Sequence, residues 1–126
     1  MSGKKTIFIA FAKDDEATRR YFTEDRIATE TEFEFIDLSV DEAVEPDWQD
    51  KVRSRIGRSD GVIALISTDT QYSTRQLWEI TCAVEGAIPL VGIWIQTRYR
   101  GKPPRMGSAP FREWTWENIS AFIDSL

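Results

Sequence analysis

Apolar residues in this chain gather in short runs, each with the length of a β-strand. Three runs, at residues 6–11, 61–66 and 89–95, are almost continuously apolar. That pattern is typical of strands that are buried on both faces of a sheet. Residues 33–36 form a shorter stretch that alternates between apolar and polar, so we expect a strand nearer to an edge.

The segments between these runs carry signals for helices. Asp14 and Asp15 are suited to cap a helix and to complement its dipole. Pro46 is suited to open another, in which apolar residues recur every four positions from Trp48 to Ile56. Further helices are expected from the same kinds of signal, and the full set is one at residues 16–29, one opened by Pro46, one at 75–85 that ends at Gly86, and one at 117–125.

The stretch that follows the last apolar run has the composition of a long irregular loop. Glycines and prolines interrupt it repeatedly up to Pro110, and loops of this length in compact domains are usually functional. A short strand that includes Trp114 and Trp116 is expected after it. The loop is also basic, since no acidic residue interrupts its five cations, which are Arg98, Arg100, Lys102, Arg105 and Arg112.

Alternation of apolar strands with helices predicts the fold class. Strands of this kind form a parallel sheet with helices on both faces. We therefore expect an α/β, flavodoxin-like, three-layer sandwich with a mostly parallel sheet of four to five strands. The 126 residues are enough for one core but not for two, so residues 1–126 are expected to form a single domain.

The amino-acid composition excludes several kinds of catalytic and binding site. The chain has no histidine, so a Ser-His-Asp triad, a Cys-His pair and the usual zinc sites are excluded, and we expect neither a metal nor a bound cofactor. A net charge of −5 argues against non-specific binding to nucleic acid. No apolar run is long enough to span a membrane, and the first residues do not resemble a signal peptide. With a single cysteine, Cys82, these features indicate a cytoplasmic protein.

The segment from Ser67 to Ile80 is the strongest candidate for a functional site. It leads from a buried strand through a polar loop into a helix, and ligands of open α/β sheets bind at such strand ends. Ser73 and Gln76 have the spacing of a capping box at the start of the helix. Glu79 then lies off the apolar stripe, which is formed by Leu77, Ile80 and Val84. From the residues alone, Glu79 is either turned into the crevice at the strand ends or is a solvated residue paired with Arg75.

Other classes of protein with this fold can be tested by the residues that their sites require. A dinucleotide-binding site and a flavodoxin-type phosphate loop need a glycine-rich or phosphate-binding turn after the first strand, where this chain has residues 11–14 without glycine. A phospho-acceptor receiver domain has acidic residues there, as this chain does, but also needs an aspartate at the end of the third strand. Ser67 and Thr68 stand at that position, and Asp69 comes slightly later. A receiver-like domain is therefore the weakest of the alternatives.

The chain resembles the TIR-like family, in particular the small bacterial TIR-like proteins of Thoeris antiviral systems. The resemblance is carried by the opening strand at residues 7–11, by the central strand at 62–68 and by the helix segment at 75–80, which bears the family's glutamate. Enzymes of this family cleave the bond between nicotinamide and ribose in NAD, and some of them cyclise the ADP-ribose into a signal. The resemblance implies that NAD is a substrate rather than a cofactor, and that Glu79 is the catalytic glutamate.

The resemblance also implies which residues surround the substrate. Two positions depart from the family pattern: Ala10 stands where many members have a small hydroxyl residue, and Arg75 stands where a tryptophan is usual. Arg98, Arg100 and Arg105 are candidate contacts to the pyrophosphate of the nucleotide or to an acidic partner. The candidate substrate-binding residues are Phe11, Ala12, Lys13, Ser67, Thr68, Tyr72, Arg75 and Trp78.

Two readings of function remain open at this point. In the first, the chain is an NAD-consuming enzyme of antiphage immunity, self-associates to complete its site and makes a product that a separate effector protein senses. In the second, it is a non-catalytic TIR-like scaffold or signalling-interaction domain. Free nicotinamide after incubation with NAD separates these readings.

Overall fold

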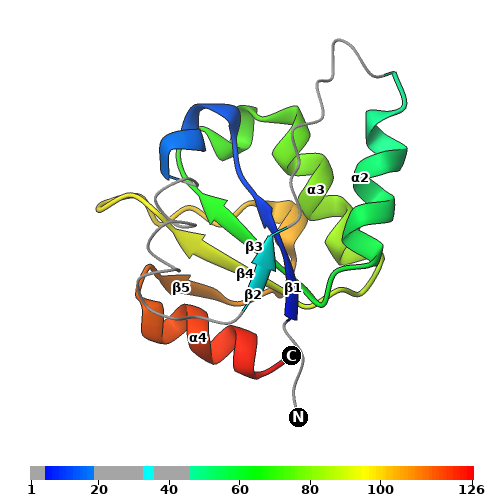
Figure 1. Ribbon diagram of the computed structural model, residues 1–126. Helices are drawn as coiled ribbons and strands as arrows, with labels where there is room; N and C mark the ends of the chain where they lie inside the picture. Colours follow the sequence, from blue (N-terminus) through cyan, green and yellow to red (C-terminus); the bar gives the residue numbers. More distant parts are fainter. Residues whose placement is uncertain (1–4, 19–32, 36–45) are drawn as a thin grey trace.

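The computed structural model describes residues 5–18, 33–35 and 46–126, and the strands of these segments form one five-stranded parallel sheet (Figure 1). Every pair of neighbouring strands in the sheet is parallel. The order across the sheet is β2-β1-β3-β4-β5, which is the flavodoxin-like order. The strands are β1 (Lys5–Ala10), β2 (Phe33–Phe35), β3 (Gly61–Ile66), β4 (Leu90–Trp94) and β5 (Phe111–Glu113).

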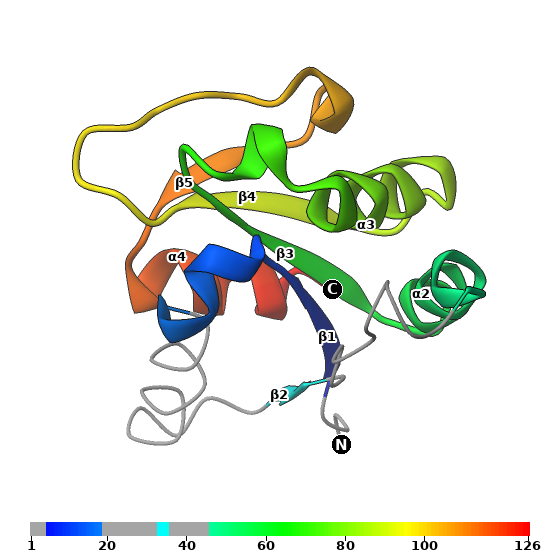
Figure 2. The same cartoon turned by 90° about the horizontal axis from the view of Figure 1, so that it is seen from above.

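Helices cover both faces of the sheet. Seen from above, α2 and α3 lie on one face and α4 lies on the other (Figure 2). The α-helices are α2 (Trp48–Gly57), α3 (Thr74–Glu85) and α4 (Trp116–Asp124). In the part of the chain that the structure describes, three short 3-10 helices lie in the connections, and these are η1 (Lys13–Asp15), η2 (Thr70–Tyr72) and η3 (Pro104–Met106).

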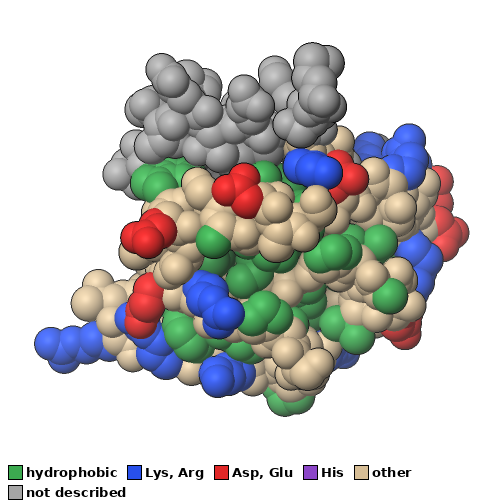
Figure 3. Space-filling model, turned by 90° about the horizontal axis from the view of Figure 1, so that it is seen from below, with side chains coloured by type: hydrophobic (Ala, Val, Ile, Leu, Met, Phe, Trp, Pro, Cys, Tyr) green, Lys and Arg blue, Asp and Glu red, His purple; other side chains and the backbone are tan. Residues whose placement is uncertain are grey.

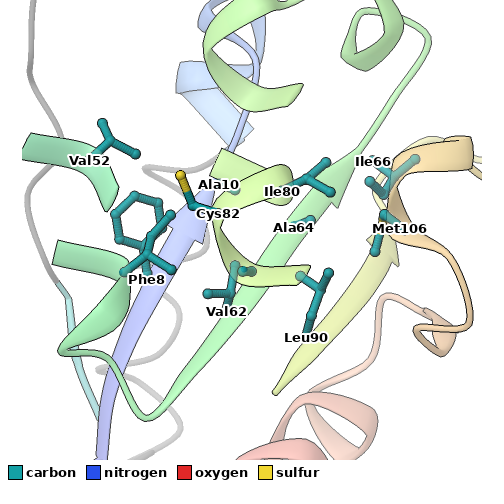
Figure 4. Close-up of a cluster of buried hydrophobic side chains, with 12 residues drawn as sticks. Phe8, Ala10, Val52, Val62, Ala64, Ile66, Ile80, Cys82, Leu90 and Met106 are labelled. Atoms are coloured by element: carbon teal, nitrogen blue, oxygen red, sulfur yellow. The ribbon is translucent and has the colours of Figure 1, made fainter. Parts of the chain in front are cut away.

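Alternation along the strands divides the core into two layers. Phe8 and Ala64 contribute to the cluster that packs under α2 and α3, which also contains Cys82 and Met106 (Figure 4). The neighbouring strand residues belong to the second cluster, which includes Ile119 of α4. Because successive side chains of a strand point to opposite faces, one continuous apolar run serves both layers. The predicted three-layer α/β sandwich is confirmed.

Most of the predicted elements are confirmed where the structure describes them. The central strand has the predicted bounds, and the stretch at residues 33–36 contains β2, which lies at the edge of the sheet. In α2, Val52 and Ile56 are buried as their spacing predicts. Of the helix expected at residues 16–29, residues 16–18 are helical, and the remainder lies outside the described residues. No helix of the described segments is long and apolar enough to cross a membrane.

The predicted strand at Trp114 and Trp116 is wrong. The last strand is β5, which precedes Trp114, and Trp116 is instead the first residue of α4. Thr115 decides the boundary, because its side chain accepts a hydrogen bond from the backbone N–H of Asn118 at 3.0 Å and so caps the helix.

The predicted apolar stripe of α3 is also wrong. Val84 is 45% exposed, and Leu77 is only partly buried. The face that packs against the sheet contains two polar residues, and its buried members are Gln76, Glu79, Ile80, Cys82 and Ala83. A hydrophobic pattern cannot reveal a buried face on which glutamine and glutamate replace apolar residues.

Candidate functional site

The carboxyl ends of the two central strands meet the start of α3. β1 and β3 pair as far as Ala10 and Ala64, so the residues that follow these two strands emerge side by side. Phe11 and Ser67, which follow β1 and β3 respectively, are buried. A helix terminus beside the carboxyl ends of parallel strands is where ligands bind in open α/β sheets.

Glu79 is the acidic residue that α3 turns into the interior. Its side chain is 1% exposed, and the Nε atom of Arg75 lies 3.9 Å from its Oε2 atom. The Arg75 guanidinium also lies over the ring of Phe11, 5.3 Å from the ring centroid. The structure therefore brings together three of the predicted site residues, Phe11, Arg75 and Glu79. Glu79 is paired with Arg75 as anticipated, but it is buried, so its interpretation as a solvated helix residue is wrong.

Gln76 joins the start of α3 to the strand ends. Its side-chain Nε2 donates hydrogen bonds to the backbone carbonyl oxygens of Ala10 at 3.0 Å and Leu65 at 2.8 Å. Only half of the predicted capping box is present: the hydroxyl of Ser73 accepts from the backbone N–H of Gln76 at 3.1 Å. The backbone N–H of Ser73 donates instead to the carbonyl of Thr70 at 3.1 Å, which leaves the side chain of Gln76 to turn inward.

Asp15 belongs to the same region, although the sequence analysis assigned it only to helix capping. It lies within η1, whose N-cap is Ala12, and it is buried. The hydroxyl of Ser67 donates to Oδ2 of Asp15 at 2.5 Å and accepts from the backbone N–H of Asp69 at 3.1 Å. The helix that Asp15 was expected to cap lies largely outside the described residues, so its capping role stays a prediction. Its position just beyond a buried strand was the signal for a role at the strand ends.

Burial shifts the titration of this carboxyl group. The pKa of Asp15 is raised above its ordinary value of 3.8, first because burial disfavours the charged form. The hydrogen bond from Ser67 acts in the opposite direction, and the negative charges of Asp69 and Asp14 raise the pKa further. A buried carboxyl group that is bonded to a hydroxyl at the end of β3 is thus a second polar group of the candidate site.

The other predicted substrate-binding residues lie in different surroundings. The indole Nε1 of Trp78 donates to the carbonyl of Gln49 on α2 at 3.1 Å, and Arg53 lies over its ring. Trp78 therefore packs between the two helices, away from Phe11. Tyr72 is 80% exposed, whereas Ala12 is buried behind the end of β1.

Two further predicted contacts lie at the rim of the strand ends. Lys13 is exposed within η1. Thr68 is also exposed, and its backbone N–H donates to the side-chain oxygen of Gln96 at 3.0 Å. This bond ties the loop after β3 to the start of the basic loop.

The arginines of the basic loop are held by different elements. Arg100 donates through Nε and Nη2 to the two carboxylate oxygens of Glu113, at 3.1 and 2.7 Å, and through Nη1 to the carbonyls of Gln96 and Tyr99, both at 2.8 Å. Arg105 donates to the hydroxyl of Thr81 on α3 at 3.1 Å. Arg98 is exposed.

These partners show what the basic loop contributes to the fold. On the face of the molecule that is seen from below, several Lys and Arg side chains gather at one corner (Figure 3). All three nitrogens of the Arg100 guanidinium bond to Glu113 or to carbonyls of the loop, whereas Arg105 bonds to Thr81, so these two arginines are held by different parts of the fold. Among the described residues, no group of three or more His, Cys, Asp or Glu side chains could hold a metal ion.

Comparison with known protein families gives a match over most of the chain. The model of a family described as Thoeris protein ThsB, TIR-like domain, matches residues 8–100 of the chain. The matched region includes the second half of β1 and all of β3, α3 and β4, and it contains Phe11, Ser67, Arg75 and Glu79. A search of curated proteins found no match.

Proposed function

The chain belongs to the Thoeris ThsB TIR-like domain family, and from this premise we propose that it is an enzyme that cleaves NAD between nicotinamide and ribose. Membership of the family supports a role in Thoeris antiphage systems. The proposal adds a reaction and assigns its central residue, Glu79. It also includes three expectations that the resemblance implies. NAD is a substrate, a separate effector protein senses the product, and the reaction takes place in the cytoplasm.

The observation that carries the proposal is the burial of Glu79 at the strand ends. Acidic side chains are rarely fully buried unless they are paired or functional. Glu79 lies on the sheet-facing side of α3, beside the cation of Arg75 and one helical turn after Gln76. A carboxylate in so dry a place interacts strongly with a developing positive charge.

The reaction needs a carboxylate more than it needs a general acid. When the bond between C1′ of the ribose and the ring nitrogen breaks, its electron pair passes to the pyridinium nitrogen, and nicotinamide leaves as a neutral molecule. The ribose is left as an oxocarbenium-like cation, which a carboxylate stabilises. Water that adds to this cation gives ADP-ribose and a proton, whereas attack by a group of the same molecule gives a cyclic product.

Arg75 must move before this chemistry can take place. The side chain of Glu79 is 1% exposed, and that of Arg75, which lies against it, is 18% exposed. The cationic nicotinamide ring and the guanidinium would repel each other in the same space. We expect the substrate to enter when Arg75 swings away from Glu79 and Phe11, where it can then meet the pyrophosphate.

Incubation with NAD and measurement of free nicotinamide test the proposal. The unsubstituted protein is expected to release nicotinamide, and Glu79→Gln to lower the rate at least about 100-fold, since the amide has similar size but no charge. Glu117→Gln is a matched control on the exposed side of α4 and should keep the full rate. Equal rates for Glu79→Gln and the unsubstituted protein would remove Glu79 from the mechanism.

A second candidate, a non-catalytic TIR-like scaffold, is favoured by the same ion pair. An arginine and a glutamate in adjacent turns of one helix, both largely buried, also form a structural contact. In that case no nicotinamide appears with any of the proteins, and light scattering shows association that rises with concentration. The receiver-like alternative has no further support, because Ser67 follows β3 where a receiver has its aspartate.

A further inference from the structure

Gln76 is a buried polar residue of α3 that the proposed reaction leaves without a role. It is fully buried, and its two carbonyl partners, on Ala10 and Leu65, belong to neighbouring strands of the sheet. Because both partners are acceptors, only the NH₂ end of the amide can face them. A primary amide is one of the few side chains that donate two hydrogen bonds from one small group, so the residue type fits this place closely.

The hydrogen bonds of Gln76 fix the first turn of α3, and the position of Glu79 depends on that turn. Gln76 is the third residue of α3, and Glu79 follows three residues later on the same buried face. Residues at this spacing lie one above the other along a helix. A shift of the first turn away from Ala10 and Leu65 would therefore carry Glu79 with it.

The remaining atom of the amide shows that packing alone does not explain this residue. The Oε1 atom of Gln76 is buried and accepts no hydrogen bond from the residues that the structure describes. A buried acceptor without a partner costs free energy, which a methionine or leucine at the same place would avoid. The amide is retained for the two bonds that it donates.

We infer that Gln76 is a positioning residue, which holds the carboxylate of Glu79 at the strand ends for the reaction. This inference rests on the proposed function. It differs from a capping role, because the backbone N–H of Ser73 already has its own partner. It also differs from a catalytic role, since the NH₂ group of Gln76 is occupied by the two carbonyls.

Steady-state NAD cleavage by Gln76→Met and Gln76→Glu tests the inference, after thermal melts have shown that both variants are folded. Methionine keeps the volume without donors, and a carboxyl group has one donor only when it is protonated. We expect kcat to fall about 100-fold in both variants near pH 8, with KM changed by less than about threefold. Near pH 5 the Glu variant should recover part of kcat relative to the unsubstituted protein, and the Met variant should not.

Gln49→Met, on the exposed side of α2, is the control and should keep kcat at both pH values. A Met variant with full kcat would show that only volume matters, and the inference would be overturned. Equal behaviour of the Met and Glu variants at every pH would overturn it too.

Hydrogen exchange separates this inference from the proposed reaction. In Gln76→Met, the backbone amides of the first turn of α3 should lose protection, whereas Gln49→Met should leave them unchanged. Unchanged exchange would overturn the inference even if the unsubstituted protein cleaves NAD. Faster exchange, with no nicotinamide from any protein, would instead overturn the proposed function and leave Gln76 as the anchor of Glu79.

Discussion

Arg75 and Glu79 of α3 are the two charged residues at the centre of the proposed site. Glu79 and Arg75 form a largely buried ion pair, with 3.9 Å between Nε of Arg75 and Oε2 of Glu79. Removing one partner of such a pair leaves the other charge uncompensated, so stability and function are coupled at this point. Substitutions of Glu79 therefore need a thermal melt beside each rate measurement.

Asp15 gives the first prediction, which concerns pH. Its pKa in the folded protein is raised above 3.8, chiefly by burial. A raised folded pKa means that the neutral form is favoured by folding, so the contribution to stability is complete below the unfolded pKa. It is lost as the pH rises through the folded pKa. Relative to Asp15→Asn, the unsubstituted protein should thus lose free energy of unfolding as the pH rises above about 4, measured by urea unfolding at several pH values.

Ser67 supplies the control for this pH dependence. Its hydroxyl donates to Asp15 and so lowers the pKa of that carboxyl group. In Ser67→Ala the pKa of Asp15 should rise further, and the loss of stability should move to higher pH. A difference between the unsubstituted protein and Asp15→Asn that stays constant with pH would contradict the assignment.

At the scale of elements, sequence patterns located strands better than faces. The bounds of β3 follow directly from its continuous apolar run, because a strand buried on both faces needs no polar residue. The same reasoning misassigned the buried face of α3, since Gln76 and Glu79 are polar residues with partners inside. Their partners, which include Ala10 and Leu65, come from other elements, and one segment of sequence does not contain that information.

The candidate site, like the faces of α3, could be predicted from the sequence only in part. A glutamate on the helix after the central strand marked the region, and the structure brings Arg75 and Phe11 together with it. Trp78 instead contacts α2, a partner that the sequence pattern of α3 does not contain. The polar contact between Asp15 and Ser67 joins residues 52 positions apart, which only the pairing of β1 with β3 brings together.

The end of α3 gives the second prediction. Ala87 has a φ of 55°, a left-handed conformation that favours glycine. The backbone N–H groups of Ala87 and Ile88 donate to the carbonyls of Val84 and Ala83, at 3.2 and 2.9 Å, which is the bonding of a Schellman motif. Ala87→Gly should therefore raise the free energy of unfolding by about 1 kcal/mol, measured by urea unfolding.

The same substitution in a helix interior is the control for Ala87. Ala121 is exposed within α4, where glycine is less favourable than alanine. Ala121→Gly should lower the free energy of unfolding by about 1 kcal/mol. If both substitutions destabilise the protein, the conformation assigned to Ala87 is wrong.

The basic loop gives the third prediction, which separates Arg100, whose bonds hold the loop, from Arg98. Arg100 bonds to Glu113 and to two carbonyls, and Nε1 of Trp94 donates to the carbonyl of Gly101 at 2.9 Å. Arg100→Ala should lower the free energy of unfolding by about 1 kcal/mol, because several charge-assisted bonds are lost together. Arg98→Ala should change it by less than about 0.5 kcal/mol.

Nucleotide binding distinguishes the two arginines in the opposite sense. If the exposed end of the loop contacts the pyrophosphate of NAD, Arg98→Ala should weaken binding at low salt, and the effect should shrink as salt screens the charge. Calorimetric titration with NAD measures this. Equal affinity for Arg98→Ala and the unsubstituted protein at low salt would leave the loop with a structural role or an acidic partner.

At the scale of the whole molecule, the fold and the function are separate questions. The strand order of this sheet is shared by proteins with unrelated activities, so the order alone assigns none of them. What distinguishes this chain is which residues stand at the strand ends, namely Ser67 in place of an aspartate and Glu79 on the helix that follows. The family match covers both positions.

The last prediction concerns self-association. We expect a domain of this size to offer one wall of a nucleotide pocket at its strand ends. A second copy that covers the strand ends would exclude water and strengthen the interaction of Glu79 with the ribosyl cation. We therefore expect the rate of nicotinamide release per molecule to rise with protein concentration, in parallel with the mass from light scattering. A constant rate per molecule over a wide dilution series, with a monomer throughout, would show that a single chain completes the site.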